Sequence, residues 1–483
     1  MDDHHKNLRR GFNWLGSATI IAKLIDFGTT LAVLWFLTKD QVGIGSLVWS
    51  IAFVVEATEG LGTGAAILQA KSISRLQLDS VFWFSIGVAV IAGALVWLAA
   101  PLIQDLYHIP GLANYFVAVI AKLLFVGAAL VPLQMLNREL KYERIAVVNV
   151  SATLGAALTR LTVAAMGGGA WAIVIGYAAH GLYVLIGVQI ANPFVPRLRF
   201  RLSAITGLIH FGFRAAAAET MQQLFRNVDY LLVGWFYGPG PLAIYRVAFD
   251  ITMEPAAAIG DLVNRTALPV FSRFSVAKEQ VAQSFTWAIG RIVTLIGPFM
   301  AALILSADQL TALIHDANGA SYSAAALPLK ILAGAAVLRA LYQLLYPLVL
   351  GTGRPGMAVR MSASTLLMLT VGLLGAGMIF QAQHGIVAMS LVWLAIYPLL
   401  LVWGARFAVH TYALNMRELA SSMAIPVTAT AAMIAAIEMI RLLANWPNPY
   451  LQITVTLTAL ALTYAGMFFY TRRRIAKLTA GTG

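Results

Sequence analysis

The chain has 483 residues, of which 60% are hydrophobic and only 11% are charged. About a quarter of the residues of a soluble domain are charged, so this composition excludes a water-soluble fold and predicts a protein whose surface faces lipid. The net charge of +13 would by itself be compatible with nucleic-acid binding, but the basic residues are scattered between long apolar runs, and we expect no nucleic-acid partner.

The first predicted membrane helix covers residues 11–37. A basic stretch precedes this apolar run, as in a signal peptide, but the run is longer than a signal-peptide core and carries Lys23 and Asp26. It also lacks the small-residue pattern of a secretory cleavage site. We therefore interpret it as the first membrane span.

Further apolar runs follow along the whole chain. A helix needs about 20 mostly apolar residues to cross the hydrocarbon core. The runs are continuous and do not alternate, and open sheet edges are unstable in lipid, so we expect an all-α integral membrane protein. The connections are too short to hold a soluble domain. With the first span, the predicted segments number fourteen, the others covering residues 41–67, 80–101, 112–136, 145–166, 168–191, 203–237, 241–270, 281–306, 322–350, 361–380, 384–405, 418–441 and 450–471.

The charges of the loops give an independent check on this division. Nearly all Lys and Arg residues of the connections fall on the face that holds both termini, whereas the opposite face has Lys39 and Arg441. By the positive-inside rule, both termini are cytoplasmic. A miscounted helix would reverse the bias beyond the error, so its persistence to the C-terminus supports an even number of spans.

An internal repeat links the two halves of the chain. Residues 24–60 align without gaps to residues 224–260, and the Trp-Phe pair at 35–36 recurs at 235–236. The offset is six helices, so both copies have the same orientation in the membrane and are related by a pseudo-two-fold axis along the membrane normal. Parallel-repeat transporters bind substrate between their halves and work by alternating access.

The repeat predicts three parts. The first lobe and the second lobe each contain six helices, and two further helices with a basic cytoplasmic tail complete the chain. These parts are residues 1–202, 203–410 and 411–483.

Charged residues also occur inside the predicted spans. A charge at the bilayer centre costs about 3 kcal/mol on insertion scales, so these residues must line a hydrated cavity or pair with one another. Pairing on one helix face is an open alternative. The spacing of three or four residues allows it for Lys23 with Asp26, Arg226 with Asp229, Arg246 with Asp250, and Asp261 with Arg265.

The second half has a surplus of intramembrane arginine over acid. A guanidinium group binds phosphate oxygens through two parallel hydrogen bonds, so this surplus favours an anionic ligand. We predict a pyrophosphate-binding, anionic-substrate site. Its candidate residues are Arg214, Arg226, Arg265, Arg291 and Arg339, with Lys23 and Lys122 facing them from the first half.

Four intramembrane acids are candidates for ion coupling, that is, for carrying H⁺ or Na⁺. They lie at nearly equivalent places in the two repeats, and the alternative that they neutralise nearby arginines stays open. They are Glu56, Glu59, Asp250 and Glu254.

Motifs of catalysis are missing from the sequence. It has no Walker A motif, dinucleotide fingerprint or nucleophile elbow. Its histidines lack metal-ligand spacing, and the lack of cysteine excludes thiolate sites. We expect a protein that is not an enzyme and that has no metal and no cofactor.

Several stretches together carry a family resemblance that covers nearly the whole chain in order and spacing. They resemble the polysaccharide-exporter (Wzx-type) branch of the multidrug/oligosaccharidyl-lipid/polysaccharide (MOP) flippase superfamily. The stretches are GLGTGAAILQAKSISRLQLDSVFWFSI (60–86), LNRELKYERIA (136–146), LFRNVDYLLVGWFYGPGPLAIYRVAFDI (224–251), LPVFSRFS (268–275) and PLVLGTGRP (347–355).

The resemblance implies a V-shaped fold of fourteen helices and a cationic central cavity in the bacterial inner membrane. It implies a flippase that turns undecaprenyl-diphosphate-linked oligosaccharide repeat units from the cytoplasmic to the periplasmic leaflet for exopolysaccharide, capsule or O-antigen synthesis. Membrane lipids, and a polysaccharide polymerase with its co-polymerase, are the candidate partners. No site motif transfers residue by residue, so the candidate residues rest on depth and charge.

Three alternatives remain open. A cation-coupled multidrug or small-molecule antiporter of the same superfamily would need acids to bind cations, whereas the second half is net basic. A lipid II flippase is also cationic, but the stretches quoted above look less like it. A membrane-embedded glycosyltransferase or polymerase would need catalytic acids beside a large outward loop, and every outward loop predicted here is short.

Overall fold

The computed structural model describes residues 2–273, 277–412, 414–444 and 448–480. Within these ranges the chain folds into sixteen α-helices and three short 3₁₀ helices, and no β-strand occurs. Twelve of the helical segments are long and apolar enough to cross a membrane. The all-helical membrane class predicted from composition is therefore confirmed.

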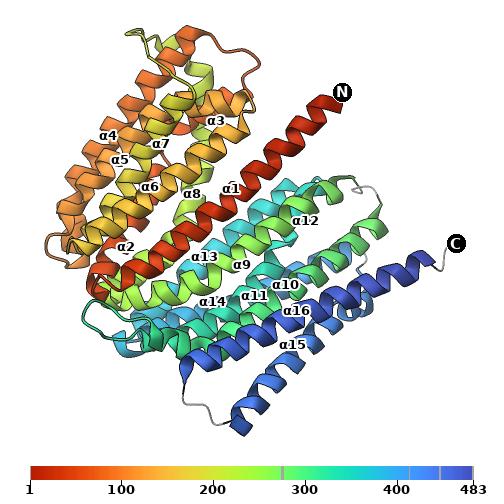
Figure 1. Cartoon of the computed structure of the whole chain (residues 1–483). Helices are drawn as coiled ribbons and strands as arrows, with labels where there is room; N and C mark the ends of the chain where they lie inside the picture. Colours follow the sequence, from red (N-terminus) through yellow and green to blue (C-terminus); the bar gives the residue numbers. More distant parts are fainter. Residues whose placement is uncertain (1, 274–276, 413, 445–447, 481–483) are drawn as a thin grey trace. The chain divides into compact units, whose positions relative to one another are not determined.

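By their contacts the described residues divide into two compact units, and the first consists of residues 1–243 and 315–320. Helices α4, α5, α6 and α7 pack against one another within it (Figure 1). The elements of this unit are α1 (Asp2–Leu34), α2 (Lys39–Glu56), η1 (Glu59–Gly62), α3 (Thr63–Gln69), α4 (Arg75–Tyr107), α5 (Leu112–Arg138), α6 (Tyr142–Ala165), α7 (Trp171–Ala191), η2 (Leu202–Ala204) and α8 (Thr206–Tyr237).

The second unit consists of residues 244–314 and 321–483, so that α9 begins in the first unit and continues in the second. Helix α10 packs against α11, α15 and α16, and α14 packs against α11 and α13. The elements are α9 (Pro239–Arg273), α10 (Lys278–Leu313), η3 (Ser323–Ala325), α11 (Ala326–Gln343), α12 (Leu345–Gly351), α13 (Pro355–Ile379), α14 (Ala382–Tyr412), α15 (Met416–Ala444) and α16 (Pro449–Ala480).

The helices reproduce the predicted segments one for one. When α2 and α3 are counted as one segment, and α11 and α12 as another, the described helices form fourteen segments in the predicted order. Helices α8 and α9 are not among the twelve most apolar segments, and both carry several of the charged residues discussed above. Their length is still sufficient to cross a bilayer.

The repeat seen in the sequence is visible in the helix boundaries. Helix α2 begins at Lys39 and α9 at Pro239, and each begins three residues after a Trp-Phe pair, which lies just beyond the end of α1 in the first copy and in the last turn of α8 in the second. Contacts nevertheless group α8 with the first unit, because it packs against α2, η1 and α3. In the sequence repeat, α8 therefore corresponds to α1. By its contacts, α8 belongs to the first unit.

A break interrupts the second membrane segment, which we predicted as one continuous span. Gly60, Leu61 and Gly62 have φ angles of 53°, 45° and 69°, which lie in the left-handed region that favours glycine. Glycine is also required at position 62 because a Cβ there would lie 2.1 Å from the carbonyl oxygen of Gly212 on α8. Helix α2 therefore ends before the break and α3 continues after it.

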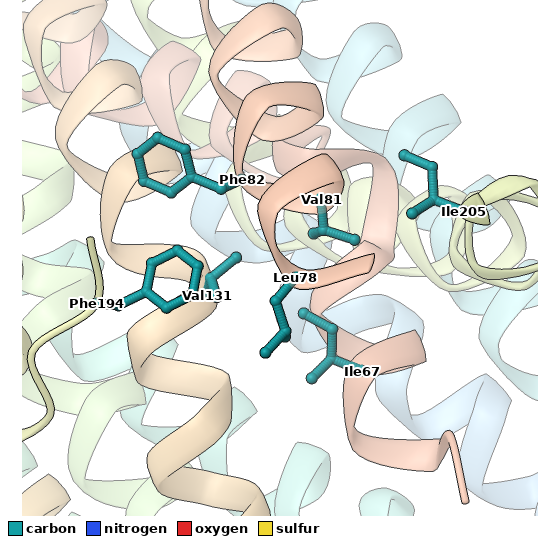
Figure 2. Packing of buried hydrophobic residues seen from close by; sticks show 7 residues of the cluster. All are labelled: Ile67, Leu78, Val81, Phe82, Val131, Phe194 and Ile205. Atoms are coloured by element: carbon teal, nitrogen blue, oxygen red, sulfur yellow. The ribbon is translucent and has the colours of Figure 1, made fainter. Parts of the chain in front are cut away.

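A small hydrophobic cluster holds the far side of this break in place (Figure 2). Ile67 of α3 packs with Phe82 of α4, Val131 of α5 and Phe194. The guanidinium group of Arg138 donates hydrogen bonds to the carbonyl oxygens at the end of α3, including that of Ile67 at 2.8 Å. These bonds satisfy acceptors that a helix end leaves unpaired, so the short α3 has a fixed position.

Candidate functional site

A buried ion pair lies at the centre of the first unit. The Lys122 ammonium of α5 donates a hydrogen bond of 2.8 Å to Oε2 of Glu56 on α2. The Tyr177 hydroxyl of α7 donates to the same oxygen. Lys122 is only 5% exposed, so its charge depends on this partner. The Glu56 carboxylate thus joins α2, α5 and α7.

Aromatic rings surround the cation of this pair. The Lys122 ammonium lies 3.4 Å from the centroid of the Tyr177 ring and 5.8 Å from that of Phe53. A cation over an aromatic face is attracted by the ring quadrupole. We call Phe53, Lys122 and Tyr177 the first cradle.

A second buried cation lies beside the first cradle. Nη1 of Arg160 on α6 lies 3.2 Å from Oδ1 of Asp26 and donates a 3.3 Å hydrogen bond to Thr30, both on α1. The Arg160 guanidinium also lies 5.2 Å from the Trp49 ring. Asp26 therefore pairs with a helix distant in sequence, whereas Lys23, its neighbour by spacing, has an exposed side chain on α1.

Glu59 lies at the start of the helix break, one turn beyond Glu56. Its Oε1 is buried and has no hydrogen-bond partner in the described part of the chain. A Cβ added at Gly127 of α5 would lie 3.7 Å from this oxygen, which places Glu59 against α5. The charged groups that act on it there are Glu56 and Lys122. The structure thus brings three predicted site residues together.

The second unit contains a similar arrangement around Arg339 of α11. The guanidinium carbon lies 5.4 Å from the centroid of the Trp393 ring on α14. Nη1 donates to Sδ of Met253 on α9 at 3.7 Å. The Trp393 ring is 1% exposed and is held by a 2.9 Å hydrogen bond from its Nε1 to the Tyr245 hydroxyl. We call Met253, Arg339 and Trp393 the second cradle.

The two cradles occupy equivalent positions in the repeat. Each cation comes from the fourth segment of its half, α5 or α11, and stacks on an aromatic ring from the sixth, α7 or α14. Phe53 and Met253 correspond directly in the alignment of the two copies. The repeat therefore preserves a cation stacked on an aromatic ring, although the residue types differ.

The cradles differ in their charge balance. Glu56 corresponds to Ala256 in the second copy, so the counter-ion of the first cradle has no equivalent. Among the described residues, no carboxylate lies within ion-pair distance of Arg339, and its Nε is buried without a hydrogen-bond partner. The second cradle therefore holds a partly buried positive charge that no described carboxylate neutralises. Such a charge is suited to binding an anionic group.

The other predicted basic residues lie apart from the cradles. Arg291 of α10 is half-buried, and its guanidinium lies 5.3 Å from the Trp287 ring. Arg214 and Arg226 have exposed side chains on α8. Arg265 is part of α9, and its side chain lies outside the described residues.

The two predicted acids of the second half also lie in α9. Asp250 pairs with Arg246 one turn earlier, at 3.2 Å, which agrees with the pairing that the spacing allowed. Glu254 is exposed. Within the ranges that the structure describes, no group of three or more His, Cys, Asp or Glu residues is arranged to hold a metal ion.

Sequence reasoning missed the uncharged members of the site. Tyr177 and Trp393 were not predicted, because a tyrosine or tryptophan in an apolar helix is indistinguishable from a core residue. Arg160 was not selected as a site residue either, since nothing in the sequence indicated that it lies near Glu56 and Lys122.

Sequence comparisons place the chain among proteins of polysaccharide synthesis. It is 21% identical to the lipopolysaccharide biosynthesis protein WzxC of Escherichia coli K12, over 63% of this chain and 62% of that one. It is 22% identical to the teichuronic acid biosynthesis protein TuaB of Bacillus subtilis 168, over 77% of each chain. The matched region thus spans less than two thirds of WzxC.

Structural comparisons identify the fold. The lipid II flippase MurJ in an inward closed conformation superposes with a TM-score of 0.74 at 13% identity, over 95% of this chain and 99% of that chain. An inward-facing multidrug MATE transporter of the MOP superfamily gives 0.62 at 15% identity, over 80% and 95%. The chain therefore has the MOP fold.

The sequence profile of the polysaccharide biosynthesis protein family matches residues 33–320, which is more than half of the chain, and this protein therefore belongs to that family.

Proposed function

We propose that this protein is a flippase for surface-polysaccharide synthesis. It moves undecaprenyl-diphosphate-linked oligosaccharide repeat units from the cytoplasmic to the periplasmic leaflet of the bacterial inner membrane. Membership of the polysaccharide biosynthesis family supports this role, as do relatives named for lipopolysaccharide, teichuronic acid and succinoglycan synthesis. The excess of basic residues on one face supports cytoplasmic termini.

The observation that carries the proposal is the uncompensated charge of Arg339. A diphosphate group carries negative charge and presents oxygens that a planar guanidinium can bind through two parallel hydrogen bonds. The Nε of Arg339 has no hydrogen-bond partner among the described residues. Its guanidinium carbon lies 5.4 Å from the centroid of the Trp393 ring. We assign Arg339 to the diphosphate, and Arg291, Arg214 and Arg226 stay candidate residues for binding the anionic substrate.

The same observation argues against a cation-coupled drug antiporter. Such a transporter binds cationic ligands, and in the second half of the chain it would need an acid that is free to bind them. At the repeat position equivalent to Glu56, the second half has Ala256, and Asp250 is paired with Arg246. Transport by alternating access follows from the parallel repeat, and a polymerase and co-polymerase acting on the delivered units are proposed partners.

Deletion of the gene, followed by complementation, tests this function. We expect loss of the surface polymer and accumulation of undecaprenyl-linked repeat units, both reversed by the wild-type gene. Unchanged polymer with altered sensitivity to cationic drugs would contradict the proposal and favour the antiporter. Accumulation of the peptidoglycan precursor lipid II, with the surface polymer intact, would instead indicate a lipid II flippase.

A further inference from the structure

The connection between α7 and α8 is held in place near both of its ends. Phe194 follows α7 and Ile205 precedes α8, and both are buried in the same hydrophobic cluster (Figure 2). The Arg75 guanidinium lies 4.3 Å from the centroid of the Phe194 ring. The backbone amide and carbonyl groups of Phe194 both bond the side chain of Gln189, at 2.9 and 3.1 Å. Buried residues therefore fix where this connection starts and ends.

The backbone between these two ends is fixed as well. The amide of Arg197 donates to the buried Asp79 carboxylate at 3.2 Å, and the amide of Arg201 donates to the Ser80 hydroxyl at 3.1 Å. The carbonyl oxygen of Arg197 accepts a 2.9 Å hydrogen bond from the Trp83 indole. These three partners lie in the first turns of α4, so the connection runs along that end of α4 with its backbone bonded to the helix.

The side chains of this connection, in contrast, lie outside the core. We call residues 195–203 the surface segment. Leu198 is 90% exposed, and more than half of Phe200 and of Leu202 is exposed. Three exposed arginines alternate with these apolar residues, and they are Arg197, Arg199 and Arg201. Large apolar side chains that stay outside the core on a fixed backbone mark a surface for a partner or a membrane.

The arginines of the surface segment do not serve the fold. Three other arginines of the first unit donate to backbone carbonyl oxygens, and they are Arg75, Arg138 and Arg144. The guanidinium groups of Arg197 and Arg199 have no acceptor among the described residues, and that of Arg201 bonds only Ser203 within the segment. The sequence has no acid from residue 144 to residue 218. The segment therefore presents three positive charges that are available to an anionic partner.

We propose that the surface segment binds the headgroups of anionic phospholipids, such as phosphatidylglycerol, at the membrane surface. It joins α7 and α8, which are each long enough to cross a bilayer, so it lies at the level of the headgroups. Basic side chains beside a membrane span attract anionic lipid, and interleaved apolar side chains enter the boundary between headgroups and acyl chains. By the positive-inside rule this surface is the cytoplasmic leaflet.

The apolar residues of the segment distinguish a lipid from a soluble phosphate. A soluble phosphate would bind the guanidinium groups but would leave Leu198 and Phe200 in water. A phospholipid supplies both the phosphate and an apolar phase in which these side chains are buried. This lipid site is separate from the flippase function proposed above and does not depend on it.

Native mass spectrometry of the full-length protein in neutral detergent tests the site. The protein is titrated at low salt with equimolar phosphatidylglycerol and phosphatidylcholine of the same acyl chains, and the ratio of the two bound lipids is measured. We expect the wild type to prefer phosphatidylglycerol. The preference should fall by about fivefold for each arginine removed in the Arg197→Gln/Arg199→Gln/Arg201→Gln variant. Leu198→Gln/Phe200→Gln should bind less of both lipids.

The matched control removes three exposed arginines of the second unit. Arg360→Gln/Arg406→Gln/Arg417→Gln has the same net charge as the triple variant of the segment and should keep the wild-type preference. Replacement of all three arginines of the segment by lysine should also keep most of it, because attraction to an anionic surface depends on the charge. Since the replaced side chains of the segment lie outside the core, its variants should keep the wild-type denaturation temperature.

A wild-type preference retained by the folded triple glutamine variant of the segment would overturn the site. So would a wild-type protein that binds phosphatidylglycerol and phosphatidylcholine equally. Unchanged lipid binding by Leu198→Gln/Phe200→Gln, together with displacement of phosphatidylglycerol by millimolar glycerol phosphate, would assign the arginines to a soluble phosphate and overturn the membrane surface as their partner.

Discussion

The Lys122 ammonium lies 2.8 Å from the Glu56 carboxylate, although the two residues are 66 positions apart in the chain. The repeat equivalent of this cation, Arg339, has the same kind of aromatic support, but Ala256 replaces the acid. Among the described residues, one half of the repeat therefore holds a cation that is paired with an acid, and the other half holds a cation that is not. This asymmetry distinguishes the two halves of the repeat and is the reason that Arg339 is our candidate for binding an anionic group.

The ion pair itself should be visible in stability measurements. Lys122→Met or Glu56→Gln leaves the other charge without its partner in a largely buried site, which costs about 3–5 kcal/mol in soluble proteins. We expect a lower thermal denaturation temperature in detergent for each single variant and recovery of much of the loss in the double variant. Equal denaturation temperatures for wild type and both single variants would show that the pair contributes nothing.

Arg339 should be required for export but not for folding. We expect Arg339→Gln to abolish export in the complemented deletion strain, while the amount of protein in the membrane stays normal. Arg339→Lys should keep part of the activity, because it retains the charge but loses the planar group that stacks on Trp393. Arg291→Gln should also abolish export.

The control for these variants is another arginine that is stacked on aromatic rings. Arg354 lies 5.9 Å from the Phe407 ring and 5.8 Å from the Tyr412 ring, outside both cradles. Arg354→Gln should export normally. Full export by Arg339→Gln would remove Arg339 from the substrate site, and an equal loss in Arg354→Gln would show that the effect is not specific to the second cradle.

Gly212 of α8 lies against the helix break at Gly60–Gly62, and this position should not tolerate a larger side chain. A Cβ at Gly212 would lie 2.5 Å from the carbonyl oxygen of Leu61, so Gly212→Ala should reduce the yield and the denaturation temperature of the folded protein. Gly207→Ala on the same helix is the control, because a Cβ there has open space. Its effect should be neutral or slightly stabilising, by at most about 1 kcal/mol. Equal behaviour of the two variants would contradict the close approach.

The orientation can be tested by single cysteines, because the chain has no cysteine of its own. Asn318→Cys, in the exposed connection between α10 and η3, should react with a membrane-impermeant maleimide in intact spheroplasts. Ser72→Cys, in the exposed connection between α3 and α4, should react only after the membrane is permeabilised. The reverse pattern would contradict cytoplasmic termini.

Most of the fold could be predicted from the sequence, because lipid imposes strong rules on length and charge. All fourteen segments occur in the predicted order, and α5, predicted at residues 112–136, spans Leu112–Arg138. The break at Gly60–Gly62 was missed. Its glycines are visible in the sequence, but the need for left-handed backbone arises from the approach of α8, which hydropathy does not report.

The candidate site could be predicted only in part. Glu56, Glu59 and Lys122 were each named for their charge at membrane depth, and the structure brings them together. Their grouping depends on which faces of α2 and α5 meet, and a run of apolar residues around each charge does not reveal that. The pairing of Asp26 with Arg160 was missed for the same reason, since spacing along one helix favoured Lys23.

The central claim is that the protein moves a lipid-linked substrate between leaflets. The most direct test is to measure on which side of the membrane the undecaprenyl-linked repeat units accumulate when the protein is depleted. Spheroplasts depleted of the protein are treated with a membrane-impermeant reagent that oxidises sugars, and the labelled fraction of undecaprenyl-linked repeat units is measured. We predict that the units remain protected until the membrane is permeabilised, and that wild-type protein but not Arg339→Gln restores labelling. Units that are already labelled in depleted spheroplasts would contradict a flippase and place the defect after translocation.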